Sequence, residues 1–96
     1  MPPLSWSRHA LQDLARLHAF LKDKDANAAR KAVAAIRNGV RLLEHHPQAG
    51  PRVEGMEPQF RRWSIEFGDA GYLVLYRHDP DRTVLLAVRH MKEAGY

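Results

Sequence analysis

Five cationic side chains on predicted strands are the residues of this sequence best suited to chemistry. They are Arg61, Arg62, Arg77, Arg89 and His90. Arginine binds phosphate or carboxylate through paired hydrogen bonds, so a cluster of this kind can hold a nucleic-acid backbone or an acidic protein segment. Histidine, with an unperturbed pKa of ~6.5, can act as a general acid or base. We therefore expect an anion-binding surface, with His90 as a candidate for proton transfer.

The spacing of these residues limits how many of them can act together. Successive side chains point to opposite faces of a strand, so Arg61 and Arg62 cannot share a face. A slip of one residue in the strand register would reverse every assignment. In the alternative interpretation the arginines lie apart and each pairs with a nearby acid. The acids concerned are Glu66, Asp79 and Asp81.

Two residues of the C-terminal segment are weaker candidates for the same surface. Lys92 adds a cation, and Tyr96 can stack on a base or fill a pocket on a partner. The alternative is a frayed tail without such a role.

The sequence predicts no metal site and no cofactor. His45 and His46 are adjacent, which is not the spacing of metal ligands, and no His-Glu-x-x-His motif occurs. Gly68 and Gly71 fall in a predicted hairpin, whereas a phosphate-binding loop lies between a strand and a helix. Cysteine is absent, so the chain has neither disulfides nor thiolate ligands. That composition suits a reducing cytoplasm.

The first element expected to position the cations is an amphipathic helix that follows a short N-terminal strand. The strand covers Leu4–Trp6, and Ser7 is a suitable helix N-cap, so the helix should begin at Arg8. Its apolar face is formed by Ala10, Leu11, Leu14, Leu17 and Leu21.

A second amphipathic helix should follow at once. Asp25 or Asn27 can cap its start, and Pro47 and Gly50 stop it. Gly39 costs a helix interior about 1 kcal/mol relative to alanine unless close packing requires it. We expect that packing to be against the first helix. The apolar face of this helix is formed by Ala29, Ala32, Val33, Ile36, Val40 and Leu43.

The rest of the chain is predicted to form consecutive antiparallel strands, because from Gln59 its residues alternate with a period of two. Residues 47–58 are rich in proline and glycine and form an irregular connection. Strands are expected from Gln59, over 72–77 and over 84–90, with hairpin turns at 68–71 and 79–82. The predicted fold is α+β in the order β-α-α-β-β-β, with a helical hairpin packed on one face of an antiparallel sheet.

Length, composition and charge limit the number of domains, the kind of partner and the cellular location that we expect. The 96 residues, 45% of them hydrophobic, can enclose one core, so residues 1–96 are expected to form a single domain. The formal charge of +4, carried mostly by arginine, favours an acidic protein partner or a nucleic acid. No apolar run approaches the ~20 residues of a membrane span, and the N-terminus lacks the features of a signal peptide. We expect a soluble cytoplasmic protein with no membrane partner.

Several short motifs occur in a fixed order along nearly the whole chain. They are Trp6-Ser7 at a helix start, His46-Pro47-x-x-Gly50 at a helix end, Phe60-Arg61-Arg62, Tyr72-Leu73-Val74-Leu75-Tyr76-Arg77, Val88-Arg89-His90 and the ending Lys92-Glu93-Ala94-Gly95-Tyr96. The ordered set resembles the RelE/ParE superfamily of type II toxin–antitoxin toxins, most closely its ParE-like plasmid-stabilisation branch.

That resemblance implies a bacterial cytoplasmic toxin that a cognate antitoxin neutralises by wrapping its C-terminal segment over it. RelE-type members are small RNases that cut mRNA in the ribosome. ParE-type members inhibit DNA gyrase and are not enzymes. The resemblance also implies an apolar groove beside the helix pair for an amphipathic antitoxin segment, with acidic antitoxin residues on the basic surface.

Leu73 favours the ParE-like branch. Nuclease members carry an arginine at the matching position, and leucine cannot stabilise charge on a scissile phosphate. Glu54 and Glu57 are only loosely placed as a catalytic carboxylate, and the nuclease's terminal cation falls on Met91, one residue from His90. For a gyrase inhibitor the implied toxicity residues are Arg61, Arg62, Arg77, Arg89, His90, Lys92 and Tyr96.

Two alternatives remain open on the sequence. The first is a ribosome-dependent mRNA endonuclease, with catalytic residues Arg62, Arg77, Arg89, His90 and Tyr96. The second is a degenerate toxin that is harmless and only binds an antitoxin.

Overall fold

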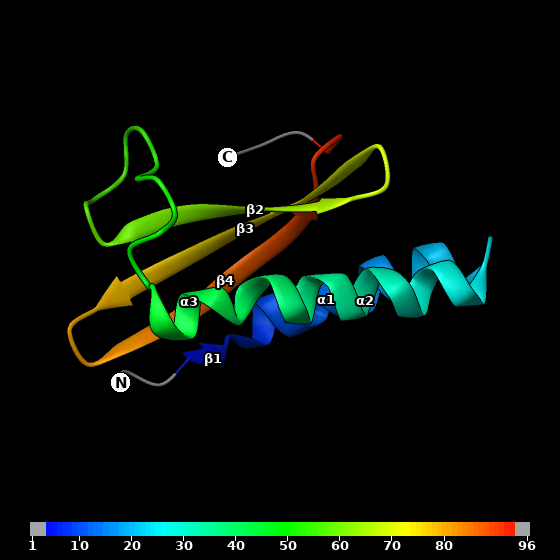
Figure 1. Ribbon diagram of the computed structural model, residues 1–96, viewed down its shortest axis with the longest axis horizontal. Helices are drawn as coiled ribbons and strands as arrows, with labels where there is room; N and C mark the ends of the chain where they lie inside the picture. The colour runs from blue at the N-terminus through cyan, green and yellow to red at the C-terminus, as the bar shows by residue number, and fades with distance from the viewer. Residues whose placement is uncertain (1–3, 94–96) are drawn as a thin grey trace.

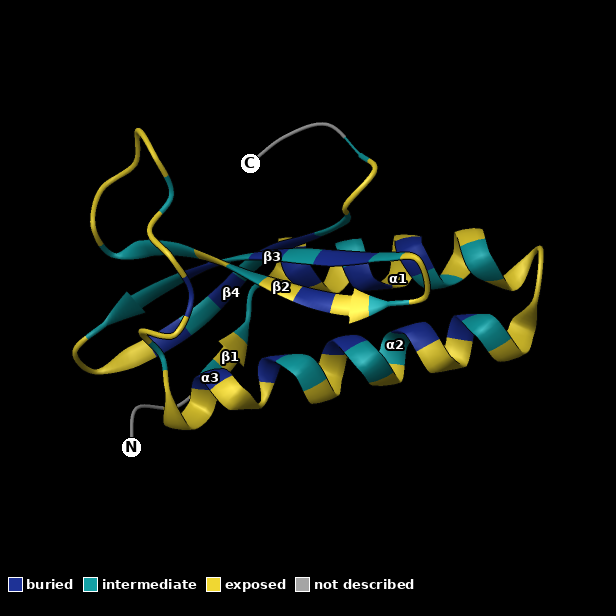
Figure 2. Ribbon diagram, turned by 45° about the horizontal axis from the view of Figure 1, so that its top comes forward, coloured by how far each residue is buried: buried dark blue, intermediate teal, exposed yellow. Residues whose placement is uncertain are grey.

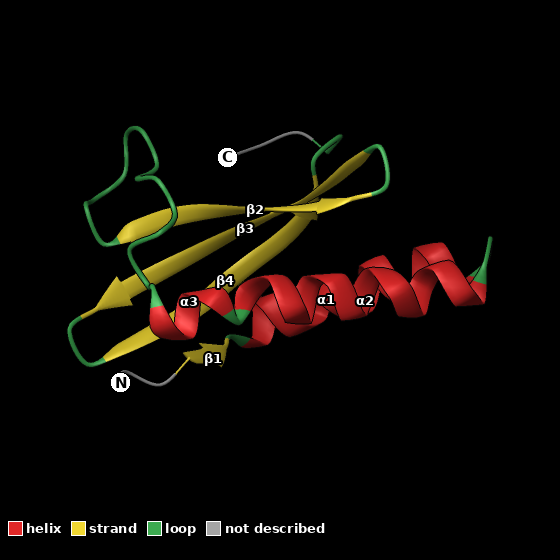
Figure 3. Ribbon diagram, viewed as in Figure 1, coloured by secondary structure: helices red, strands yellow, loops and turns green. Residues whose placement is uncertain are grey.

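The computed structural model describes residues 4–93 as a four-stranded sheet with two long helices on one face (Figure 1). The elements are β1 (Leu4–Trp6), α1 (Arg8–Lys22), α2 (Ala26–Val40), α3 (Leu42–His45), β2 (Phe60–Phe67), β3 (Ala70–Asp79) and β4 (Arg82–His90). Figure 3 shows the helical hairpin beside the sheet, so the predicted α+β architecture is confirmed. None of the helices within residues 4–93 has the length and apolar character needed to cross a membrane.

The sheet has the strand order β1-β4-β3-β2. Strands β2, β3 and β4 form the predicted antiparallel meander, with turns at the predicted positions. β1 instead pairs with β4 in parallel, so the sheet as a whole is mixed rather than purely antiparallel. Turn residues in the sequence predict the relative direction of consecutive strands only. β1 and β4 are not consecutive, because the helices and strands β2 and β3 lie between them in the chain.

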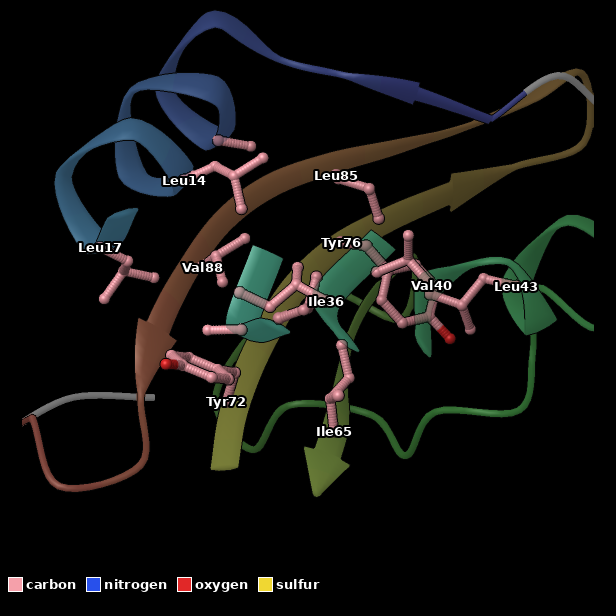
Figure 4. Close-up of a cluster of buried hydrophobic side chains, with 13 residues drawn as sticks. Leu14, Leu17, Ile36, Val40, Leu43, Ile65, Tyr72, Tyr76, Leu85 and Val88 are labelled. Atoms are coloured by element: carbon pink, nitrogen blue, oxygen red, sulfur yellow. The ribbon is translucent and has the colours of Figure 1, made fainter. Parts of the chain in front are cut away.

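The core lies between the helical hairpin and one face of the sheet (Figure 4). Ile65, Tyr72, Val74, Tyr76, Leu85 and Val88 come from the sheet, and Ala10, Leu14, Leu17, Ala32, Ile36, Val40 and Leu43 come from the helices. Figure 2 shows that the outer sides of α1 and α2 are exposed. Leu11, which we predicted for the apolar face of α1, lies on this outer side with 48% of its surface exposed.

Ser7 joins the start of α1 to β4. It is the predicted N-cap, because its Oγ accepts a hydrogen bond from the N–H of Ala10 at 3.0 Å. Its own N–H donates to the carbonyl of Leu85 at 2.9 Å, and its Oγ donates to the carbonyl of Leu86 at 3.2 Å. One residue therefore caps the helix and binds two consecutive carbonyls of the strand.

These two carbonyls belong to a β-bulge. Tyr76 of β3 lies opposite Leu85, but Leu75 lies opposite Ala87, so Leu86 is an extra residue in β4. A bulge of this kind reverses the alternation of every later residue in its strand. After Leu86, the side chains of β4 that simple alternation would place toward the helices therefore point to the opposite face.

The second helix is broken where we predicted it to be continuous. The indole Nε1 of Trp63 donates to the carbonyl of Gly39 at 2.9 Å, an acceptor that an unbroken helix would use for the N–H of Leu43. Near this point the N–H of Arg41 bonds to the carbonyl of Asn38, three residues back. The long helix thus ends at Val40, and α3 forms a separate turn.

Gly39 packs against the sheet rather than against α1. A Cβ at this position would lie 2.7 Å from Cγ1 of Ile65, closer than such atoms approach in proteins. The prediction that close packing requires a glycine here is confirmed, but the partner we named was wrong. The glycine lets α2 approach β2.

We predict that Ser7→Ala lowers the free energy of unfolding by about 1–3 kcal/mol, because both the helix cap and the bond to the Leu86 carbonyl are lost. Urea denaturation measures the change. Ser7→Thr keeps the hydroxyl and should recover most of the loss. Ser5→Ala, at an exposed residue of β1, is the control and should stay within about 0.5 kcal/mol of the native chain. Equal effects of Ser5→Ala and Ser7→Ala would contradict this role of Ser7.

Candidate functional site

Three of the five predicted cations share the sheet face that points away from the helices. Arg62 lies opposite Leu75, Arg77 lies opposite Val84, and Arg89 lies opposite Leu73. Directly opposite residues point to the same face, and so do residues two apart in one strand. We call this surface the arginine face. Arg62 and Arg77 are diagonal neighbours on it, a spacing of roughly 7–8 Å between Cα atoms.

Arg77 is held by two neighbours. Its Nε donates to the Asp79 carboxylate at 2.8 Å, and its guanidinium lies 5.5 Å from the centre of the Phe60 ring. The hydrogen bond to Asp79 raises the pKa of Arg77, so the group stays charged. This is the acid pairing that we weighed as the alternative to a cluster, and for Arg77 it is confirmed. The charge of Arg77 is therefore partly offset, while its position is fixed.

Apolar side chains lie between the arginines on the same face. Phe60, Leu73, Leu75, Val84 and Ala87 alternate with the cations across β2, β3 and β4. All except Ala87 are half-buried although no helix covers them. A surface of arginine and aromatic residues around half-buried aliphatic groups is typical of the centre of a protein–protein interface.

Arg61 has a structural position instead. It faces the helix side, opposite Tyr76, and its Nη1 donates to the carbonyls of Gln48 and Gly50 at 3.2 and 2.7 Å. The Tyr76 hydroxyl, which is buried, accepts from the N–H of Gly50 and donates to the carbonyl of Pro47. Arg61 and Tyr76 thus fasten the connection between α3 and β2. The structure separates Arg61 from Arg62, as alternation required.

His90 also lies on the helix side, at the opposite end of the sheet. It stands opposite Tyr72, and the two rings are 5.4 Å apart in an edge-to-face arrangement. Its Nδ1 accepts the N–H of Lys92 at 3.1 Å, which closes the turn after β4. His90 is therefore on the other side of the sheet from Arg62, Arg77 and Arg89.

A pocket of about 530 Å³ opens beside His90, and no sequence pattern indicated it. We call it the end pocket. It is lined by Leu17, Phe20 and Leu21 of α1, by Phe67, Gly68, Asp69 and Tyr72 of the β2–β3 hairpin, and by Arg16, His90, Lys92 and Glu93. Phe20 is 62% exposed at its rim. The residue that could have indicated this pocket is Phe20, an aromatic residue beside the apolar positions of α1 that the sequence analysis did not use.

The residues after β4 are fastened to α1 by Glu93. Its carboxylate accepts from Arg16 at 2.7 Å and from the N–H of His90 at 3.2 Å. The hydrogen bond from Arg16 is the main reason why the pKa of Glu93 lies below its ordinary value, while partial burial opposes the shift. The candidate residue Lys92 is exposed at the pocket rim, 3.9 Å from Asp69. Tyr96, the other C-terminal candidate, lies outside the described residues.

The expected apolar groove beside the helix pair is present on the outer side of α1 and α2. It has a volume of about 320 Å³ and is lined by Leu11, Leu14, Ala15, His18, Val33 and Arg37. We call it the helix groove. Among residues 4–93, no three histidine, aspartate or glutamate side chains converge in a way that could hold a metal ion.

Residues 4–95 match the family described as the ParE toxin of the type II toxin–antitoxin system parDE. This chain belongs to that family. It is similar to Toxin RelE3 of Caulobacter vibrioides, with 31% identity over 84 residues that make up 88% of either chain. The resemblance to the RelE/ParE superfamily is thereby confirmed: the chain is the toxin of a type II toxin–antitoxin module.

Two solved structures share the fold of this ParE-family toxin. A chain from the chromosomal ParDE system of P. aeruginosa superimposes with a TM-score of 0.80 at 22% identity, over 96% of this chain and 98% of that one. The conserved hypothetical protein HP0894 of Helicobacter pylori gives a TM-score of 0.60 at 19% identity, over 97% and 98% of the two chains. At these identities the matches show the fold alone.

Neutralising Glu93 should weaken the attachment of the C-terminal turn in a pH-dependent way. A carboxyl with a lowered folded-state pKa stabilises the fold above its unfolded pKa, and this contribution is lost as the pH falls through the folded value. We expect Glu93→Gln to be less stable than the native chain at pH 7, by at most about 1 kcal/mol. The difference should begin to shrink near the unfolded pKa of about 4.3 and should disappear only when the pH is below the lowered folded pKa of Glu93.

Denaturant titrations of the two proteins across this pH range measure the difference. Asp69→Asn is the matched control, because the Asp69 side chain is 93% exposed and lies 3.9 Å from Lys92. It should have no effect at any pH. A Glu93→Gln effect that persists unchanged at low pH would contradict an ionic role for this carboxylate.

Proposed function

We propose that this toxin inhibits DNA gyrase by binding to it, and that it is not an enzyme. The observation that carries the proposal is the composition of the arginine face, where Leu73 and Leu75 lie among Arg62, Arg77 and Arg89. Such a mixture suits an acidic protein surface with apolar groups at its centre. A phosphate-cleaving site needs donors and proton-transfer groups that converge on one phosphate.

The position of His90 supports the same conclusion. A general acid or base must reach the atom whose proton it transfers, and His90 lies on the opposite sheet face from the three arginines. Leu73 stands opposite Arg89 on the arginine face and offers no donor to a developing charge. Arg77 is already bonded to Asp79. Of the groups that the nuclease alternative requires, those within the described residues are therefore divided between two faces.

The proposal includes a cognate antitoxin that covers the helix side of the molecule. Leu11 and Val33 leave apolar surface in the helix groove, and Phe20 does so at the end pocket. An amphipathic helix can place its apolar face in such a groove. Arg37, at the groove, suits an acidic residue on the antitoxin. The matched relative from P. aeruginosa is described as part of a ParDE system.

The nuclease remains the second candidate, since the curated relative is named Toxin RelE3 and RelE-type toxins cut mRNA. The three arginines would then bind the message. A degenerate toxin that only binds its antitoxin is the third.

A direct test adds the purified toxin to gyrase with relaxed plasmid, and separately to ribosomes carrying mRNA. We expect loss of supercoiling and intact mRNA, and we expect His90→Ala to inhibit gyrase as well as the native chain does, within about twofold. Expression of the toxin without its antitoxin should stop growth and leave transcripts uncut.

Cleaved mRNA that becomes intact with His90→Ala would overturn the proposal in favour of the nuclease. Undisturbed supercoiling, uncut mRNA and normal growth would favour the degenerate module. A matched denaturation curve for His90→Ala shows that the variant is folded.

A further inference from the structure

Two buried tyrosines of β3 differ in what their hydroxyl groups bind. Tyr72 and Tyr76 are 2% and 0% exposed, and both belong to the core. The hydroxyl of Tyr76 accepts from the N–H of Gly50 at 3.0 Å and donates to the carbonyl of Pro47 at 2.7 Å. No hydrogen bond joins the hydroxyl of Tyr72 to any group within residues 4–93. A buried tyrosine hydroxyl usually has a partner, so this one is an unused binding group.

The hydroxyl of Tyr72 faces the end pocket. Tyr72 is among the residues that line the pocket, and Figure 4 shows its oxygen directed toward the end of β4. Burial, and to a lesser extent the negative charge of Glu93, raises the pKa of Tyr72. The hydroxyl therefore keeps its proton at neutral pH and can donate a hydrogen bond to a molecule in the pocket.

His90 lines the same pocket and supplies a second donor. Its Nδ1 accepts the N–H of Lys92 at 3.1 Å, so in the neutral ring the proton is on Nε2. Its ring stands edge-to-face with that of Tyr72, at 5.4 Å between the ring centres. Donors on both residues favour a ligand with an oxygen acceptor.

The charged side chains around the pocket form two pairs of opposite sign. Arg16 donates to the Glu93 carboxylate at 2.7 Å, and the Lys92 ammonium lies 3.9 Å from Asp69. An ion that enters an apolar pocket loses its hydration and needs an unmatched counter-charge, which these pairs do not provide. The pocket therefore favours a neutral ligand.

Aromatic and leucine side chains form the rest of the lining. Phe20, Phe67 and Tyr72 contribute rings, and those of Phe67 and Tyr72 have centres 6.0 Å apart. Leu17 and Leu21 contribute aliphatic surface from α1. Such walls favour an aromatic ring, which packs edge-to-face or offset against others. The volume of about 530 Å³ is in the range of sites that hold small organic molecules.

We propose that the end pocket binds a small neutral phenol, whose oxygen accepts a hydrogen bond from Tyr72 while its ring lies between α1 and the β2–β3 hairpin. This site goes beyond the proposed target and antitoxin and does not depend on either. Because Tyr72 is 2% exposed, its hydroxyl is reached only from within the pocket. That position favours a compact molecule that enters the pocket as a whole over a side chain of a partner protein.

Binding to the purified full chain, followed through amide chemical shifts in NMR spectra, tests the inference. We expect 4-methylphenol to shift the amides of Gly68, Asp69 and His90 and to bind at least about fivefold more tightly than toluene, which lacks the hydroxyl. The charged analogues 4-methylbenzoate and 4-methylbenzylamine should bind more weakly than 4-methylphenol. Equal affinities for 4-methylphenol and toluene would overturn the inference.

Tyr72→Phe separates the contribution of the hydroxyl from that of the ring. It should weaken the binding of 4-methylphenol about fivefold and leave that of toluene within about twofold. Because the hydroxyl has no partner within residues 4–93, Tyr72→Phe should also keep the midpoint of urea denaturation, whereas Tyr76→Phe should lower it. An unchanged affinity of Tyr72→Phe for 4-methylphenol would contradict the role of the hydroxyl.

A pair of variants in α1 tests the location of the site. Phe20→Ala removes a ring from the end pocket and should weaken the binding of 4-methylphenol about fivefold. Leu11→Ala, in the helix groove, is the control and should leave the affinity within about twofold. The two residues are 62% and 48% exposed, so both variants should fold. Equal effects of the two substitutions would place the ligand outside the end pocket.

Tyrosine side chains carry the same chemical group, so two further measurements identify its source. An increase of tenfold or more in the affinity of Tyr96→Ala for 4-methylphenol would assign the pocket to Tyr96 of this chain, which lies outside the described residues. A fivefold loss of antitoxin affinity in Tyr72→Phe would assign it to a side chain of the antitoxin. Either result would overturn the assignment to a free small molecule, and the absence of both, with 4-methylphenol bound, would support it.

Discussion

The extra residue in β4 decides what each face of this molecule can do. Leu85 and Val88 are both fully buried under the helices, although they are three positions apart and strict alternation would separate them. Leu86 takes up the difference, and Ser7 binds the carbonyls of Leu85 and Leu86 while it caps α1. Without this bulge, the register of the first half of β4 would turn Arg89 toward the helices and His90 away from them.

The bulge thereby separates two kinds of surface. One sheet face supports the helical hairpin, and its end residues Arg61 and His90 order the connection before β2 and the turn after β4. The other face gathers arginines from three strands around half-buried leucines. The helix groove and the end pocket lie on the helix side, so an antitoxin and a target can bind to different sides of a small domain.

Local signals in the sequence predicted most of the elements. Ser7 and Asp25 cap the two helices as expected, and the Gly68 turn falls where the hairpin was predicted. These features depend on residues close together in the chain. The family assignment followed from the order of such motifs and is confirmed.

The features that the sequence did not reveal depend on contacts between distant residues. The break near Arg41 follows from Trp63 binding the Gly39 carbonyl, 24 residues away in the chain. The sequence did not predict the bulge, because residues 84–88 are all apolar. They show no alternation of apolar and polar residues that an extra residue could interrupt. The faces of Arg89 and His90, and the end pocket, follow from that bulge and from the Arg16 contact to Glu93.

The most direct test of this division is a toxin with Arg62→Ala and Arg89→Ala together, measured for growth arrest and for antitoxin affinity. Growth arrest should fall by about tenfold or more, because arginines at the centre of an interface contribute strongly to binding. Antitoxin affinity should stay within about twofold, because the helix groove and the end pocket lie on the other side. Lys31→Ala, exposed on α2, is the control. Undiminished arrest, or an equal loss of both activities, would contradict the account.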